Sequence, residues 1–324
     1  YPLGHPYSSL TIGKLEDLDR VDVTDLKKFF MRWYGPNNAT LTVCGDVDPQ
    51  NVIRLVENYY WNIPRGPEVE PMKLDQVTLD YDRYVSYVDS NIRFPAVTFT
   101  WPTVPRFHPD EAPLDALAEI LGQGKSSFMY KQFVLPQKAI NASASHPSSE
   151  LAGEFFMFVL PFPGQTLADF ETQVRTILDD FEKAGVSDDD LAKFKAGQES
   201  STINGLASVS GKVSQLASYE TFTGNPDMIG EDLTRYMDVT KEDIMRVYNK
   251  YIKGKPTVVL SILTEDTAPV KPDNYEIQTE GDNPFPTTDY DGLTYNKPSD
   301  TFDRSVKPSP GPSPLVKVPD FWSS

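Results

Sequence analysis

Apolar residues recur at helical spacing in several segments of the chain, and the clearest of these stripes begin at a capping residue. Thr24 can cap a helix that ends before Gly35. Asp48 followed by Pro49 predicts the start of a second helix, which we expect to pack on a sheet face. Further stripes predict helices over 109–122, 126–135, 165–184, 226–238 and 241–253, and a longer polar helical stretch from residue 187 to about residue 216.

Alternating apolar and polar residues predict strands between these helices. In the segment 96–103, Val97, Phe99 and Trp101 alternate with threonines. The other predicted strands cover 39–44, 84–89, 141–145, 153–162 and 257–264. Because the helices and strands do not alternate regularly, the pattern favours the α+β class, with mixed, mainly antiparallel sheets and packed helices, over a doubly wound parallel sheet.

Length and proline content predict how the chain is divided. At roughly 150 residues per domain, 324 residues suit about two domains. Residues 67–76 are rich in proline and charge, and ten of the last 59 residues are proline, so both regions are expected to be linkers. Apolar residues return after Leu315 as if a further domain were to follow, and we therefore expect the chain to be a piece of a longer protein.

The charge balance argues against two classes of partner. The 30 Lys and Arg residues against 47 Asp and Glu residues give a net charge of −17, and the resulting field repels nucleic acid and anionic lipid. No run approaches the roughly 18 apolar residues of a membrane-spanning helix, so no membrane span is expected. The lone cysteine, Cys44, lies in the predicted strand 39–44 and is expected to be a buried core thiol.

The sequence offers no catalytic or metal-binding constellation. A helical H-x-x-E-H would place two imidazoles on one zinc ion, but His108 and Glu111 are followed by Ala112 where the second histidine is needed. His5 and His146 each precede a proline and have no ligand-spaced neighbour, so we expect them to be structural or exposed, with His146 at most a titrating surface group. We therefore predict no catalytic residue and no metal ligand, and the substrate-binding residues stay unknown.

Two groups of motifs nevertheless occur in a recognisable order. The first contains His5-Pro6-Tyr7 and the segments 25–30, 33–41 and 45–49, and the second contains 97–101, 110–122, 126–127, 205–206, 216–220 and 239–251. Together they resemble the pitrilysin/insulinase family of zinc metallopeptidases, whose relatives include the mitochondrial processing peptidase and the core subunits of the respiratory bc1 complex. The resemblance covers about 260 of the 324 residues.

The resemblance implies a fold of metallopeptidase repeats of the LuxS/MPP-like kind and a division of the chain. Residues 1–66 match the second half of a first, catalytic-type repeat, 67–76 a linker, 77–265 a second, non-catalytic repeat, and 266–324 a proline-rich linker that leads to a further repeat. The zinc motif of the family lies before the position that matches Tyr1. The helix 110–121 matches the metal-binding helix but has no histidine, so zinc is expected in the parent protein and none on this segment.

The resemblance also implies partners, and it leaves alternatives open. We expect a segment of a zinc-dependent endopeptidase that forms part of a peptide-enclosing chamber, inactive alone, with a peptide or small protein as substrate. Its partner is expected to be the other half of the same protein or a second subunit, and a bacterial periplasmic or secreted location is compatible. A non-catalytic scaffold or partner subunit of the same family is the alternative, and an unrelated α+β binding protein is the third.

If residues 1–66 lack the first half of their repeat, their apolar faces lack packing partners. Phe29, Phe30, Trp33 and the face formed by Tyr59 and Tyr60 would then lose their packing partners, and we expect the residues before 66 to be held by the second domain, to be held by another copy, or to be mobile.

Overall fold

The computed structural model describes residues 1–13 and 15–277, together with positions 294, 299, 301, 303, 305 and 306. The remaining residues after 277, among them the predicted lead-in to a further repeat at Leu315, lie outside the described residues. Up to residue 277 the chain forms two compact units: one contains 1–22, 40–44 and 69–277, and the other contains 23–39 and 45–68. In the described ranges, no helix combines the length and apolar character needed to cross a lipid bilayer.

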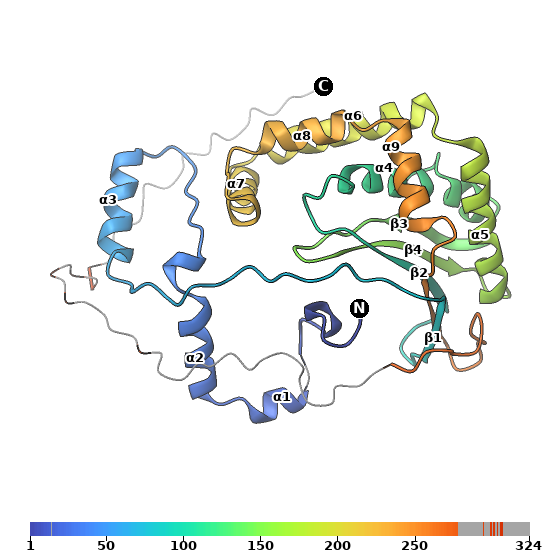
Figure 1. Ribbon diagram of the computed structural model, residues 1–324, viewed down its shortest axis with the longest axis horizontal. Coiled ribbons are helices and arrows are strands. Elements are labelled where there is room, and N and C mark those ends of the chain that lie inside the picture. The colour runs from blue at the N-terminus through green and yellow to red at the C-terminus, as the bar shows by residue number, and fades with distance from the viewer. Residues whose placement is uncertain are drawn as a thin grey trace, which may run out of the picture. The chain divides into compact units, whose positions relative to one another are not determined.

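The first unit is built on a five-stranded sheet with strand order β1-β5-β2-β4-β3 (Figure 1). The strands are β1 (Arg83–Val88), β2 (Ala96–Thr103), β3 (Ala139–Ser145), β4 (Gly153–Pro161) and β5 (Val258–Leu263). The pair β1 and β5 is parallel, and the other three neighbouring pairs are antiparallel. This mixed, mainly antiparallel sheet with packed helices confirms the predicted α+β class.

Helices cover one face of this sheet in two layers. The inner layer includes α4 (Glu111–Gly122), which packs on β3 and β4, and α5 (Leu167–Ala184), which packs on β2. The outer helices α6 (Asp188–Gly205) and α8 (Ile229–Met237) lie side by side against α4 (Figure 1). The remaining helices of this unit are α1 (Leu15–Arg20), α7 (Val209–Thr223) and α9 (Lys241–Val247), with π-helical turns at Tyr130–Val134 and Tyr248–Ile252.

The core lies between the sheet and the inner helices because the apolar stripe of each element faces it. Alternate residues of β2, Val97, Phe99 and Trp101, are at most 2% exposed, and α4 contributes Leu114 and Leu117, both fully buried. Burying such side chains stabilises the fold by about 1.5–3 kcal/mol each. The unit is therefore held together chiefly at the contact of α4 and α5 with the sheet.

Local signals set most helix boundaries. The side chain of Thr166 caps α5, Gly185 ends it with φ +66°, and the Ser187 hydroxyl accepts the Asp190 amide at the start of α6, as predicted. The helical stretch predicted from residue 187 to about residue 216 is interrupted and forms two helices. The chain turns after Gly205, and the Ser208 hydroxyl caps a separate helix, α7.

The second unit consists of two amphipathic helices and the turns that join them. These are α2 (Val23–Trp33) and α3 (Pro49–Tyr60), with a 3-10 turn at Pro36–Asn38. The Asn37 side chain holds the ends together, because its amide donates to the Pro67 carbonyl at 3.1 Å and its oxygen accepts the Gly66 N–H at 2.8 Å. Arg32 donates to the Glu68 carbonyl in the same region.

No residue of α2 or α3 is buried, and Phe29 of the predicted unpacked face is 49% exposed. Phe30 is 59% exposed and Trp61 68% exposed. The predicted strand 39–44 is wrong, because a strand needs a hydrogen-bonded neighbour and these residues form none of the described strands. Cys44 is accordingly half-buried and not a core thiol, and α3, expected to pack on a sheet face, has no buried residue.

Trypsin is expected to cut early after Arg65 and Lys73, and much later inside α5 and α6. Residues 64–79 have no regular structure and both Arg65 and Lys73 are exposed, whereas the basic residues of α5 and α6 are held in hydrogen-bonded backbone. Mass spectrometry of a digestion time course measures the order of cuts. Equal rates of cleavage at Lys73 and inside α5 or α6 would contradict the expectation, and the Lys73→Gln variant should remove the early cut at that position alone.

Candidate functional site

The helix α4 and the residue before it carry four acidic side chains. Asp110 precedes the first turn, and Glu111, Asp115 and Glu119 follow at intervals of four residues, so the last three share one face of the helix. Asp110 and Glu111 are buried, and Asp115 and Glu119 are half-buried. Buried carboxylates are stable only when they are paired or hydrogen-bonded, so their partners define what this region can do.

Asp110 is held by three donors from the C-terminal part of the first unit. Its carboxylate accepts from Arg246 Nη1 at 2.5 Å, Lys250 Nζ at 2.8 Å and the Tyr251 hydroxyl at 2.7 Å. Burial alone would raise the pKa of Asp110, but the hydrogen bonds from Lys250, Tyr251 and Arg246 outweigh it and hold the pKa well below its usual range. Asp110 therefore fastens α9 and the following turn to the start of α4.

Glu111 belongs to a second charge network that reaches α8. Its carboxylate accepts from Arg235 Nη2 at 3.1 Å and from the backbone N–H of Phe107 at 2.6 Å. Arg235 also donates to Asp232 at 2.6 Å, and Asp232 accepts the Tyr219 hydroxyl at 2.8 Å. Burial, with a contribution from Asp115, raises the pKa of Glu111 despite the Arg235 contact.

Asp115 joins α4 to the sheet through His146. Asp115 Oδ1 lies 2.7 Å from His146 Nδ1, His146 Nε2 lies 3.0 Å from the Thr103 hydroxyl, and Asp115 Oδ2 accepts the Tyr236 hydroxyl at 2.8 Å. The order hydroxyl, imidazole, carboxylate is that of a hydrolase triad. Thr103 is only 2% exposed and the His146 side chain is fully buried, so the chain of bonds braces β2, β3 and α4 and no substrate reaches it.

The three histidines therefore have structural positions. His146, expected to be structural or exposed, is structural: its side chain is fully buried between Asp115 and Thr103, so it is not a surface group. His108 stands at the start of α4, as predicted, and its Nδ1 accepts the Asp110 N–H at 3.0 Å. His5 is buried and its Nδ1 accepts the Tyr7 N–H at 3.1 Å.

The residues around α4 do not fit a zinc site. Within the described part of the chain, no three His, Cys, Asp or Glu side chains are grouped so that they could hold a metal ion. Asp115 and His146 come together, but both ring nitrogens and both carboxylate oxygens already contact Thr103, Tyr236 or each other. Side-chain partners thus satisfy the groups that would otherwise face a cation.

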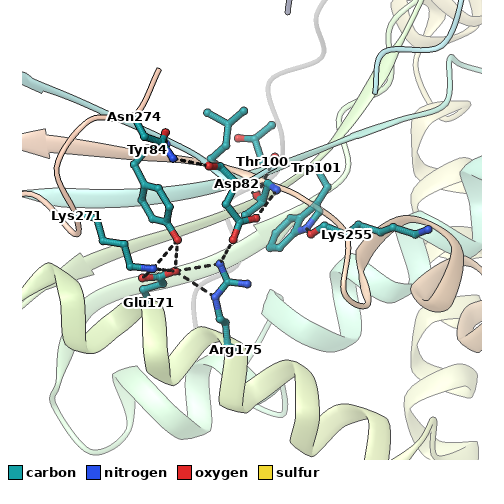
Figure 2. Close-up of polar contacts among 11 residues, drawn as sticks. Asp82, Tyr84, Thr100, Trp101, Glu171, Arg175, Lys255, Lys271 and Asn274 are labelled. Carbon is teal, nitrogen blue, oxygen red and sulfur yellow. Dashed lines mark hydrogen bonds and ion pairs between the residues drawn. The ribbon is translucent and has the colours of Figure 1, made fainter. Parts of the chain in front are cut away.

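The sheet has two edge strands, and the edge at β1 is closed (Figure 2). The Tyr84 N–H donates to the Asn274 side chain at 2.7 Å, the Asn274 N–H donates to the Tyr84 carbonyl at 3.1 Å, and the Ser86 N–H donates to Asp273 at 3.1 Å. Residues 273–274 therefore occupy the positions at Tyr84 and at the Ser86 N–H that a further strand would use, which closes this stretch of the β1 edge.

An ion-pair cluster fixes this closure to α5. Glu171 accepts the Tyr84 hydroxyl at 2.7 Å and contacts Lys271 and Arg175 at about 3 Å, and Arg175 also donates to Asp82 at 2.7 Å (Figure 2). Burial raises the pKa of Glu171, but the hydrogen bonds from Tyr84, Lys271 and Arg175 outweigh it, so the pKa is lowered and the carboxylate stays ionised.

The opposite edge, at β3, is open over part of its length. The Ala144 carbonyl accepts from Gln123 Nε2 at 2.7 Å, which shows that the backbone groups of Ala144 point away from β4. In an antiparallel pair the direction repeats every second residue, so the N–H and carbonyl of Ala142 also point outward. In the described residues no hydrogen bond to these groups of Ala142 is present. The sequence did not single out this edge, and its only signal was a strand without charged residues.

A pocket of about 620 Å³ lies between α6, α7 and α8. Its lining includes the hydroxyl and amide side chains of Ser201, Gln198, Ser214, Gln215 and Ser218. Arg106 lines the same pocket. The pocket is thus polar, and it is built from elements other than β3.

The comparisons agree with this architecture. Residues 20–198, just over half of the chain, match the family described as "Peptidase M16 inactive domain". The zinc protease PqqE of Helicobacter pylori is 26% identical over 253 residues, which are 77% of this chain and 56% of that protein. The chain therefore spans about half the length of this curated relative.

Solved structures share the fold. A protease from Helicobacter pylori superposes with a TM-score of 0.70 at 23% identity, covering 78% of this chain and 62% of that one. The first half of the periplasmic protease PqqL from Escherichia coli gives 0.63 at 16% identity, covering 79% and 57%. These findings confirm the resemblance to zinc metallopeptidases of the pitrilysin type, and the chain belongs to the Peptidase M16 inactive domain family.

Proposed function

We propose that this chain is the non-catalytic, peptide-holding part of a zinc endopeptidase, and that an extended peptide pairs with the edge of β3. The open backbone groups of Ala142 carry the proposal, because an added strand needs unpaired N–H and carbonyl groups at a sheet edge. The closed edge at β1 leaves β3 as the edge of this sheet that can accept a strand. Membership in a family described as inactive, and a relative named as a zinc protease, support the parent activity.

Pairing through the backbone suits a protein that holds many different peptides. Main-chain hydrogen bonds give affinity with little dependence on side chains, and the length of the open edge limits how much peptide is gripped. Gln123 and the end of α4 cover Ala144, so the added strand ends there. Ala142 and its neighbours would then hold a short stretch of substrate while chemistry takes place elsewhere.

The zinc ion of the parent protein would be held outside this chain. Asp115 and Asp110 are engaged by His146, Tyr236 and Arg246 and do not fit a metal, so a metal site on another part of the protein or on a partner subunit is proposed. Residues 1–66 would belong to a first repeat, 77–265 would be the inactive repeat, 67–76 would join them, and 266–324 would lead to a further repeat. The periplasmic PqqL supports an exported location.

Binding of an uncharged, rhodamine-labelled peptide of alternating valine and threonine tests the proposal by fluorescence anisotropy. The chain is expected to bind this probe, to retain no stoichiometric zinc by elemental analysis, and to cleave no peptide. Ala142 is only 8% exposed, but its outward N–H is not part of the ladder, so the variant Ala142→Pro removes this donor without breaking a bond to β4. We expect it to bind the probe at least about 10-fold more weakly, a change of about 1.4 kcal/mol.

The variant Ala142→Ser is the matched control, because it keeps the N–H and the small side chain. Both variants should retain the circular dichroism spectrum of the parent chain. Equal binding by Ala142→Pro, or chelator-sensitive cleavage by the chain alone, would sink the proposal. A chain that binds no peptide at all would instead support the scaffold alternative.

A further inference from the structure

We propose that the pocket between α6, α7 and α8 is a second peptide-binding site that recognises a carboxylate through Arg106. The site uses other elements than the β3 edge and does not depend on the proposed function. Three observations carry it: the lining of the pocket, the balance of charge within it, and the strained backbone that precedes α4.

The charge balance leaves one guanidinium without a carboxylate. Asp232 lines the pocket, but Arg235 donates to it at 2.6 Å and the Tyr219 hydroxyl at 2.8 Å. Burial, with Asp232 second, raises the pKa of Tyr219 to about 12, so the phenol stays protonated and keeps donating. Among the described residues Arg106 has no carboxylate partner, and its guanidinium instead lies over aromatic rings.

Two aromatic rings lie near this guanidinium. Its central carbon lies 5.3 Å from the ring centre of Phe107 and 5.6 Å from that of Phe222 on α7. Arg106 is exposed, and its planar fork can form two parallel hydrogen bonds with a carboxylate while one face contacts a ring. The ring of Phe107 also lies 6.1 Å from that of Tyr219, at the wall of the pocket.

The backbone at Phe107 is strained, and strain of this kind accumulates at functional sites. Phe107 has φ +61°, a left-handed conformation that costs a bulky residue free energy. The buried Glu111 carboxylate holds it there by accepting the Phe107 N–H at 2.6 Å. The same carboxylate also accepts a hydrogen bond from Arg235, the cation that pairs with Asp232. Glu111 therefore positions both the turn next to Arg106 and the guanidinium of Arg235.

Several other side chains that line the pocket can form hydrogen bonds with the N–H and carbonyl groups of a peptide backbone. Ser201, Ser214, Gln215 and Ser218 supply hydroxyl and amide groups that both donate and accept hydrogen bonds. A volume of about 620 Å³ lies in the ordinary range of ligand pockets. Because the chain carries a net charge of −17, long-range attraction does not favour an acidic ligand, and recognition rests on the local contact with Arg106.

Three rhodamine-labelled hexapeptides of glycine and serine test the proposal by anisotropy on the full chain. One contains two central glutamates and an amidated C-terminus, one contains glutamines with a free C-terminal carboxylate, and one has neither carboxylate. We expect at least one carboxylate-bearing probe to bind about 10-fold more tightly than the neutral probe, and the tighter of the two identifies the source of the carboxylate. Equal binding of all three, or no binding, would overturn the proposal.

Variants then assign the binding to the pocket. Arg106→Gln is expected to abolish the preference for the carboxylate, whereas Arg93→Gln, the same change at an exposed arginine outside the pocket, should preserve it. Ser214→Trp fills the pocket without changing charge and should weaken the carboxylate-bearing probe as well. Ala142→Pro should leave this binding unchanged. Loss of binding in Ala142→Pro, or a retained preference in Arg106→Gln, would refute the site.

Discussion

Replacing Gly122 with alanine is expected to destabilise the first unit by about 3 kcal/mol or more. Gly122 is the last residue of α4 and lies against β3, where an added Cβ would stand 1.8 Å from the Ala144 backbone nitrogen and 2.6 Å from its Cα. The atoms met are backbone, so the helix or the strand must move. Thermal unfolding should show a midpoint roughly 6–12 °C lower, at about 2–4 °C per kcal/mol for a unit of this size.

Gly197→Ala provides the matched control for this prediction. Gly197 lies inside α6, and the nearest atom to its added Cβ is the Glu119 Oε1 at 3.9 Å, an ordinary contact. Alanine is favoured over glycine inside a helix by about 1 kcal/mol, so this variant should gain stability. If Gly122→Ala matched the stability of the parent chain, the close packing of α4 on β3 would be wrong. The same variant should also weaken the peptide probe at the β3 edge, because it displaces Ala144.

The elements of the fold were accessible from the sequence wherever a local signal and a long-range contact agree. The stripe of α5 and the alternation of β2 each point apolar residues to one side, and the structure buries that side. Capping residues such as Ser187 fixed boundaries because they bond to amides only three positions away. Local chemistry therefore accounts for most boundaries in 83–263.

The strand predicted over 39–44 shows where a local pattern is insufficient. Alternation and β-branched residues make a segment able to pair, but pairing itself requires a neighbour with free backbone groups. Leu41 and Val43 are 58% and 48% exposed, as residues of a strand without a sheet would be. The helices α2 and α3 are similar, since the predicted apolar spacing forms both helices, yet neither contains a buried residue.

The polar contacts of the candidate sites were not readable at all. Asp110 meets residues 246–251, more than 130 positions away, and His146 meets Asp115 on another element. The spacing of Glu111, Asp115 and Glu119 puts three carboxylates on one face of α4. Spacing alone does not show whether a metal ion, a basic side chain or a histidine contacts these carboxylates. The resemblance predicted that the helix 110–121 holds no zinc. In the structure the acidic side chains of this helix contact His146, Arg235 and Arg246.

Replacing Asp110 with asparagine is expected to lower the free energy of unfolding of the first unit by about 3 kcal/mol. The substitution removes the charge that Arg246, Lys250 and Tyr251 share, and hydrogen bonds to charged groups contribute about 1.5–3 kcal/mol each. Arg246 and Lys250 are about half exposed and recover solvation, which keeps the total near 3 kcal/mol. The buried Tyr251 hydroxyl does not recover it, and α9 should loosen from α4. Urea unfolding of both proteins measures the difference in free energy.

The dependence of this difference on pH distinguishes a lost charge from a general disturbance. The pKa of Asp110 is lower in the folded protein than in the unfolded chain, where it is about 3.9. The ionised carboxylate therefore contributes its full stabilising free energy above about pH 3.9. This contribution is lost as the pH falls through the pKa of the folded state. The gap between parent and Asp110→Asn should therefore be constant near pH 7 and shrink below pH 4. Asp238→Asn makes the same change at an exposed position and should show a negligible gap. A gap that persists unchanged at the lowest pH would mean that Asp110 acts through its shape alone, and that the ionised carboxylate does not fasten α9 to α4.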